Sequence, residues 1–247
     1  ETKELKMIGK VGDTSKADQL VRDAEKKYKG GFLKFMGSKT ERCEEAIELL
    51  KQAANLYKLA KDWENSATAY LRCAQIEKEI QGDAASQYLE AANMQRKYNT
   101  ATAIKTMELA AETLCVEGKI SQGAKVKKQI GEIYEADKEF VLAAQAYQDS
   151  FDLYSTEGEN NTTTNNILLK VPELRIVAEE NREHLIEGIK IYEKVASKYL
   201  ENRLTAPSAK DLYFRATLLH LANDDTVGAG NAIEKYADTD PTFGTSR

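Results

Sequence analysis

The segment Ala53-Ala54-Asn55-Leu56-Tyr57-Lys58-Leu59-Ala60-Lys61-Asp62-Trp63, followed by Ala67-x-Ala69-Tyr70, decides the fold. Each part places small alanines one helical turn from a large aromatic residue. Apolar residues at i, i+3, i+4 and i+7 have the period of an amphipathic helix. Lys61-Asp62 between them is a turn signal. The segment therefore predicts two helices that approach each other closely through alanine.

The same block recurs from Thr40 to about Tyr154. Ala46, Ala85 and Ala124 lie 39 residues apart, and the interleaved set Ala67, Ala103 and Ala143 keeps nearly this spacing. Two helices per period of about 35 to 40 residues are the signature of an alpha-solenoid related to tetratricopeptide repeats (TPR). We predict an all-α fold, a TPR-like right-handed alpha-solenoid of helical hairpins, with turns at Lys61-Asp62, Gln81-Gly82-Asp83, Asn99-Thr100 and Glu117-Gly118.

Local signals predict several helix boundaries. Ser38-Lys39-Thr40-Glu41 has capping-box spacing, and Ser208 with Asp211 three residues later predicts a second N-cap. The polar run 156–165 lacks apolar periodicity and predicts a loop or a frayed helix start. Pro172 should kink a helix or lie in its first turn.

A short apolar stretch precedes the first capping box. Phe32, Leu33, Phe35 and Met36 lie between glycines, and those glycines interrupt the helical pattern on both sides. The simplest interpretation is an apolar finger that extends from a helical body. The alternative is a loop that folds back over the end of the first hairpin.

Composition excludes several classes of function. The net charge of -5 argues against nucleic-acid binding, which needs a dominant positive field. Three widely spaced cysteines without metal-ligand spacing favour a reducing cytosol. No apolar run approaches the roughly 18 residues that a membrane span needs.

The sequence offers no constellation for catalysis, so we predict neither an enzyme nor a cofactor. It has no phosphate-binding GxxxxGK[ST] loop. His184 and His220 lie far apart in the sequence. The carboxylates Glu44, Glu45 and Glu48 near a helix start suit the helix dipole better than an acid/base pair.

Residues 40–80 closely resemble the soluble NSF attachment proteins, in particular their alpha/beta branch. The order Ala-Ala-Asn-Leu-Tyr-Lys-Leu-Ala-Lys-Asp-Trp is the most specific match. The resemblance covers nearly all of the chain, and its other matching pieces are Ala91-Ala92-Asn93, Gly131-Glu132-Ile133-Tyr134-Glu135, Asn165-Asn166-Ile167-Leu168-Leu169-Lys170 and Ser208-Ala209-Lys210-Asp211-Leu212-Tyr213-Phe214.

The resemblance implies an adaptor without catalytic activity or cofactors. Such proteins coat the syntaxin-type SNARE four-helix bundle and recruit the AAA ATPase NSF, which unwinds the bundle for reuse in vesicle transport. It also implies a cytoplasmic protein that binds membranes peripherally through the loop 30–37. The domains implied are an N-terminal tail over 1–14, a twisted sheet of helical hairpins over 15–200 and the start of a C-terminal helical bundle over 201–247.

The resemblance also indicates residues on the SNARE-binding face. Lys125 aligns with a family lysine, and Lys128 shares its helix face. Asn166 stands where the family has a second lysine, and Lys170 follows one turn later. Lys210 matches a further basic contact. A row of lysines would set the register of an acidic bundle and raise the rate at which it associates. The alternative for each lysine is that it lies on a solvated helix face without a partner.

Family members continue beyond the segment that matches Asp240–Arg247, with acidic helices and a leucine-bearing tail that stimulates the ATPase. We therefore expect an incomplete C-terminal bundle and weaker activation of NSF than binding of SNAREs and membrane. The alternative function is a generic TPR-like scaffold for another helical or peptide partner.

Overall fold

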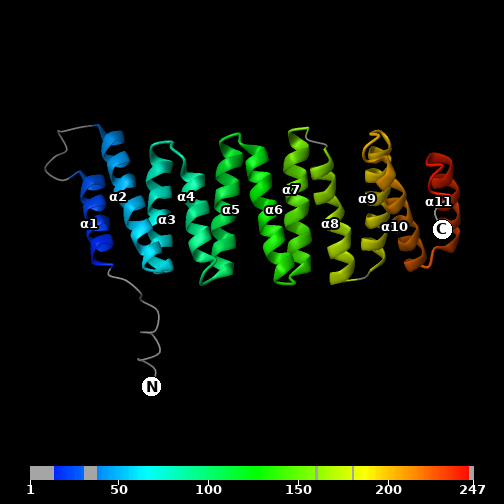
Figure 1. The fold of residues 1–247 in the computed structure, drawn as a ribbon, viewed down its shortest axis with the longest axis horizontal. Coiled ribbons are helices and arrows are strands. Elements are labelled where there is room, and N and C mark those ends of the chain that lie inside the picture. Colours follow the sequence, from blue (N-terminus) through cyan, green and yellow to red (C-terminus); the bar gives the residue numbers. More distant parts are fainter. Residues whose placement is uncertain (1–13, 31–37, 159–160, 180, 245–247) are drawn as a thin grey trace, which may run out of the picture. The chain divides into compact units, whose positions relative to one another are not determined.

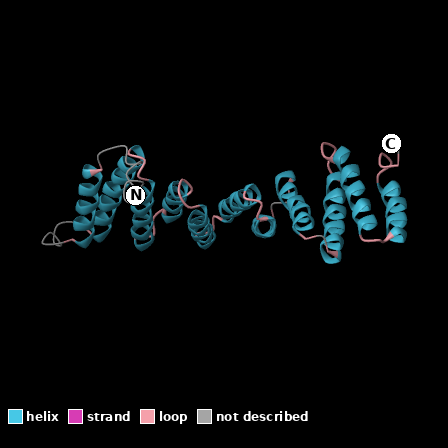
Figure 2. Cartoon of the chain, turned by 90° about the horizontal axis from the view of Figure 1, so that it is seen from below, coloured by secondary structure: helices cyan, strands magenta, loops and turns pink. Residues whose placement is uncertain are grey.

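The computed structural model describes residues 14–30, 38–158, 161–179 and 181–244. Within these ranges the regular structure is entirely helical (Figures 1 and 2). The chain divides into two compact units, Glu1–Gly123 and Ala124–Arg247, and the boundary falls inside α6. The helices are α1 (Ser15–Lys29), α2 (Lys39–Leu59), α3 (Trp63–Glu79), α4 (Ala84–Gln95), α5 (Thr100–Val116), α6 (Ile120–Ala136), α7 (Phe140–Thr156), α8 (Thr162–Ala178), α9 (Arg182–Leu200), the 3-10 turn η1 (Ala206–Ser208), α10 (Ala209–Ala222) and α11 (Thr226–Thr239).

Helices adjacent in sequence pack against each other in both units. In the first unit α1 packs on α2, α2 on α3, α3 on α4 and α4 on α5, and in the second unit the same order runs from α7 to α11. The helices α3, α5 and α7 begin at Trp63, Thr100 and Phe140, which keeps the predicted repeat of two helices. The predicted all-α fold of TPR-like helical hairpins is confirmed.

The alanines that define the repeat form the contacts between helices. Each of the six is at most 1% exposed: Ala46, Ala67, Ala85, Ala103, Ala124 and Ala143. Small side chains at a contact shorten the distance between helix axes. At this distance a hydroxyl can reach the neighbouring backbone. Ser66 donates to the Ala54 carbonyl at 2.9 Å, and Ser150 donates to the Ala124 carbonyl at 2.8 Å.

Most of the described connections between helices contain the same backbone feature. A residue with positive φ follows the end of a helix, as at Lys61 (57°), Gly118 (75°) and Lys138 (62°). In several connections the next helix then begins at an N-cap whose side chain accepts a backbone hydrogen bond, as Asp62 does from Asn65. Three of the four predicted turns lie between helices, and in the fourth Asn99 caps α5 and Thr100 is the first residue of that helix. The predicted capping box at Ser38 and Glu41 is also confirmed.

The polar run 156–165, predicted as a loop or a frayed helix start, contains a helix start and is not a loop over its whole length. Helix α7 extends to Thr156, and α8 begins at Thr162. The Asn161 side chain caps α8 by accepting from the Thr164 backbone at 3.0 Å and from its hydroxyl at 3.2 Å. Thr164 and Asn165 are buried. These polar residues cap and fill a helix, which the lack of apolar periodicity concealed.

Pro172 lies inside α8 and not in its first turn, so that alternative is wrong. Because proline has no backbone N–H, the Leu168 carbonyl cannot receive its usual helical hydrogen bond. The ring is buried where α9 approaches at Gly188. A Cβ at Gly188 would lie 3.3 Å from Pro172 Cβ and 2.7 Å from Leu219 Cδ1, so the absence of a side chain there allows the helices to meet.

The predicted helix start at Ser208 is correct, but the predicted cap is not formed. Helix α10 begins at Ala209 directly after η1, and the Ser208 side chain accepts no capping hydrogen bond. Its φ and ψ of -87° and -10° are those of the preceding turn. Side-chain capping needs a non-helical backbone at this position, whereas Ser208 has helical φ and ψ after η1.

We predict opposite effects of alanine at two glycines. Gly118→Ala should lower the free energy of unfolding by about 1 kcal/mol, because a Cβ is strained at positive φ. Gly230→Ala should raise it by about 0.5–1 kcal/mol, because this helical position has no atom within 4 Å of the added Cβ. Urea unfolding followed by circular dichroism measures both free energies. Changes of the same sign and size in the two variants would contradict the prediction.

Candidate protein-binding face

Helix α6 presents one charged stripe and one buried stripe. Lys125, Lys128, Glu132 and Glu135 are spaced three or four residues apart, which places them on one side of the helix. Ala124, Val126, Ile130 and Ile133 are buried. Lys125 is exposed and has no ion pair within the described residues. Lys127, which stands beside this stripe, instead bonds Asp149 of α7 at 3.2 Å.

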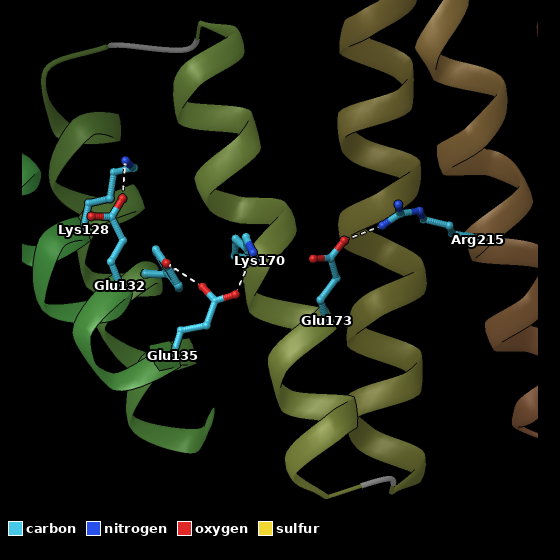
Figure 3. A network of polar contacts seen from close by, with 7 residues as sticks. Lys128, Glu132, Glu135, Lys170, Glu173 and Arg215 are labelled. Atoms are coloured by element: carbon cyan, nitrogen blue, oxygen red, sulfur yellow. Dashed lines mark hydrogen bonds and ion pairs between the residues drawn. The ribbon is translucent and has the colours of Figure 1, made fainter. Parts of the chain in front are cut away.

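Lys128 is paired within its own helix. Its ammonium group lies 2.7 Å from the Glu132 carboxylate, and the two side chains are 38% and 50% exposed (Figure 3). An exposed pair at this spacing stabilises a helix by only about 0.3–0.5 kcal/mol. Lys128 can therefore exchange this carboxylate for another at little cost.

Lys170 of α8 is held more firmly. Its ammonium group lies 2.8 Å from Glu135 of α6 (Figure 3). The Tyr147 hydroxyl of α7 donates to the other oxygen of that carboxylate at 2.7 Å. Burial raises the pKa of Glu135, but the bonds from Lys170 and Tyr147 outweigh it and hold this pKa below its ordinary value. Burial, followed by the bond to Glu135, raises the pKa of Tyr147. Glu135 is thus a fixed anion between three helices.

A further cation, Arg215 of α10, was not among the residues predicted from the sequence. Its guanidinium group pairs with Glu173 of α8 (Figure 3). The same group lies 5.9 Å from the centre of the Tyr192 ring. The partners are 42 residues apart. No spacing rule links such positions, so no local signal could have identified the pair. We call the seven residues Lys125, Lys128, Glu132, Glu135, Lys170, Glu173 and Arg215 the charged face.

The other two predicted contact residues differ from these. The Asn166 amide oxygen accepts a hydrogen bond from the Tyr199 hydroxyl of α9 at 2.9 Å. Lys210 lies half-buried at the start of α10, without an ion pair in the described part of the chain. The structure thus brings Lys125, Lys128 and Lys170 onto one face but engages the latter two with carboxylates.

Comparison with known proteins identifies the family. The family model for soluble NSF attachment proteins matches residues 15–247. The beta-soluble NSF attachment protein of Bos taurus is 33% identical over 242 residues, which span 96% of this chain and 79% of that protein. The alpha-soluble NSF attachment protein of Homo sapiens is 33% identical over 96% of this chain and 80% of its own length. The probable vesicular-fusion protein sec17 homolog of Schizosaccharomyces pombe is 31% identical over 93% and 79%.

This chain belongs to the SNAP family. The two mammalian relatives are named as soluble NSF attachment proteins. Among the described residues no cluster of histidine, cysteine and carboxylate side chains could hold a metal ion. His184 bonds the Glu179 carbonyl and His220 bonds Asp225, so each histidine has a local structural partner.

Two further features concern the membrane. None of the described helices combines the length and apolarity that crossing a bilayer requires. The predicted membrane-contacting residues Phe32, Leu33, Phe35 and Met36 lie outside the described residues of this SNAP. The described chain adjoins them at Gly30, which ends α1, and at Ser38, which caps α2.

We predict that Glu135→Gln destabilises this SNAP at pH 7 by about 1 kcal/mol, because it removes a charge-assisted hydrogen bond and an ion pair. The folded-state pKa of Glu135 is lowered from 4.5, so the contribution is present above pH 4.5 and is lost as pH falls through the lowered value. The difference in the free energy of unfolding between the variant and the unmodified protein should therefore shrink as the pH falls from about 5 to about 3. Urea unfolding across this range measures it. Exposed Glu112→Gln is the control, and a difference that grows in acid would contradict the prediction.

Proposed function

We propose that this chain is an adaptor that binds assembled SNARE bundles on membranes and recruits an NSF-type AAA ATPase for their disassembly. Family membership over residues 15–247 and the names of the relatives, NSF attachment and vesicular-fusion proteins, support the proposal. The observation that carries it to particular residues is Lys125, an exposed cation without an ion pair in the described structure.

The proposed contact lysines differ in the internal ion pair that each must break before it can bind a partner. Lys125 can meet an acidic partner without losing an internal partner. Lys128 must leave Glu132, which costs little for an exposed pair. Lys170 must leave Glu135, whose ionised form would then keep only the Tyr147 hydroxyl. We therefore assign the main basic contact to Lys125, a secondary one to Lys128 and a mainly structural role to Lys170.

Asn166 and Lys210 take lesser parts in this proposal. Asn166 is neutral and bonded to Tyr199, so it can supply a hydrogen bond at the position where relatives have a lysine, but no charge. Lys210 supplies a half-buried cation at the start of α10. Its long aliphatic stem can pack while its ammonium group stays in water.

Membrane attachment in this proposal is peripheral and weak. Phe32, Leu33, Phe35 and Met36 would each gain about 1.5–3 kcal/mol on full burial in lipid, less the entropy of ordering the loop. A contact of this size needs a second attachment to persist. SNAREs anchored in the same membrane would supply it by raising the effective concentration. This places the adaptor on the cytosolic side of vesicle and target membranes.

Lys125→Glu should weaken binding to the assembled SNARE bundle by about tenfold and reduce its dependence on salt. Co-sedimentation with the bundle at two salt concentrations measures both effects. Lys78→Glu, at an exposed position of α3 without an ion pair among the described residues, is the matched control. If the unmodified chain does not bind SNARE bundles, the proposed function is wrong and a scaffold for another partner takes its place.

Phe32→Ser combined with Phe35→Ser should abolish most recruitment to protein-free liposomes, because it removes about half of the apolar area offered to the lipid. Flotation of liposomes with bound protein measures recruitment. The control is Leu59→Ser with Val116→Ser, two apolar residues that are 79% and 89% exposed elsewhere on the chain. Equal recruitment of both variants would remove the membrane role of the loop and leave the adaptor role standing.

A further inference from the structure

The last four residues of the charged face alternate in sign along the row from α6 to α10. Figure 3 shows Glu135 of α6, Lys170 and Glu173 of α8 and Arg215 of α10 following one another across the face. Glu135 pairs with Lys170, and Glu173 pairs with Arg215. In both pairs the carboxylate belongs to the earlier helix and the cation to the later one. These two interhelical ion pairs therefore have the same polarity, whereas the Lys128–Glu132 pair lies within α6.

These ion pairs remain open to a partner. The side chains of Glu135 and Lys170 are 31% and 42% exposed, and those of Glu173 and Arg215 are 37% and 50% exposed. Arg215 has five N–H groups in a fixed planar arrangement, and a single carboxylate oxygen cannot accept hydrogen bonds from all of them. The pairs can therefore be complemented from outside without being broken.

A uniformly acidic surface fits this face poorly. The face has four cations, Lys125, Lys128, Lys170 and Arg215, against the three carboxylates Glu132, Glu135 and Glu173. An acidic side chain that approaches Lys170 or Arg215 also approaches the carboxylate already bound there. Opposed like charges in an interface disfavour a partner. A partner with basic groups opposite the carboxylates and acidic groups opposite the cations avoids this repulsion.

We propose that the charged face recognises a helical bundle whose surface presents acidic and basic side chains in alternation, and that the Glu173–Arg215 pair sets the register of that partner. This rests on the proposed function, which supplies the helical bundle. Lys125 and Lys128 meet its acidic end. Glu173 meets a basic residue, and Arg215 meets the acidic residue that follows. Glu173 and Arg215 are thus specificity-determining residues that the sequence did not indicate.

The test reverses the pair without changing its net charge. Glu173→Arg combined with Arg215→Glu keeps an ion pair between α8 and α10 but inverts its polarity. Binding to the assembled SNARE bundle should weaken by about five- to tenfold, because both positions then face like charges. The matched control inverts the exposed Asp23–Lys26 pair of α1, and its binding should not change. Thermal unfolding checks that both proteins fold.

A second variant distinguishes a partner of alternating charge from a uniformly acidic partner, because the two predict opposite changes in binding affinity. Glu173→Gln should weaken binding by about two- to fivefold if the carboxylate meets a basic residue. A uniformly acidic partner would instead bind this variant more tightly. Tighter binding, or no effect of either change at Glu173, overturns the inference while SNARE binding by the unmodified chain upholds the proposed function. Failure of the unmodified chain to bind overturns both.

Discussion

The close approach of neighbouring helices through alanine is the constraint on which this structure depends. The equivalent alanines Ala46 of α2, Ala85 of α4 and Ala124 of α6 are almost completely buried. Where an alanine would still be too large, glycine takes its place, as at Gly131, where a Cβ would lie 3.1 Å from the Tyr147 ring. Because the contacts between helices use small residues, the long charged side chains project from the remaining faces. The proposed binding surface is a consequence of this packing.

The charged face is joined to the core through Tyr147. This side chain is buried, yet its hydroxyl reaches Glu135 and fixes the carboxylate that holds Lys170. Lys170, a half-buried lysine held by such a carboxylate, differs from Lys125, which is exposed and has no ion pair in the described structure. The pairing of α6 with α8 and of α8 with α10 also links helices that are not neighbours in sequence. The carboxylates of these pairs thereby hold Lys170 and Arg215, whereas Lys125 has no ion pair in the described structure.

Local rules succeeded where the signal was contained in a few adjacent residues. The capping box at Ser38 and the turn at Lys61-Asp62 depend only on backbone conformation and short-range hydrogen bonds, and both are present. They failed where a residue distant in sequence or the preceding turn altered the helix boundary or its cap. Thr164 and Asn165 lie in α8 because they are buried, and Ser208 does not cap α10 because η1 sets its backbone. The roles of Lys125 and of Phe32 to Met36 came from family resemblance, and they stand as proposals.

The sequence by itself determined the helical class, the repeat of two helices and the family, because periodicity and residue order are properties of the chain alone. It also placed Lys125 and Lys128 on one side of one helix. Only the tertiary structure decided which charges meet. Glu135 and Lys170 are 35 residues apart, and Glu173 and Arg215 are 42 apart. Their contacts exist because packed helices bring distant turns together, which no spacing within the chain encodes.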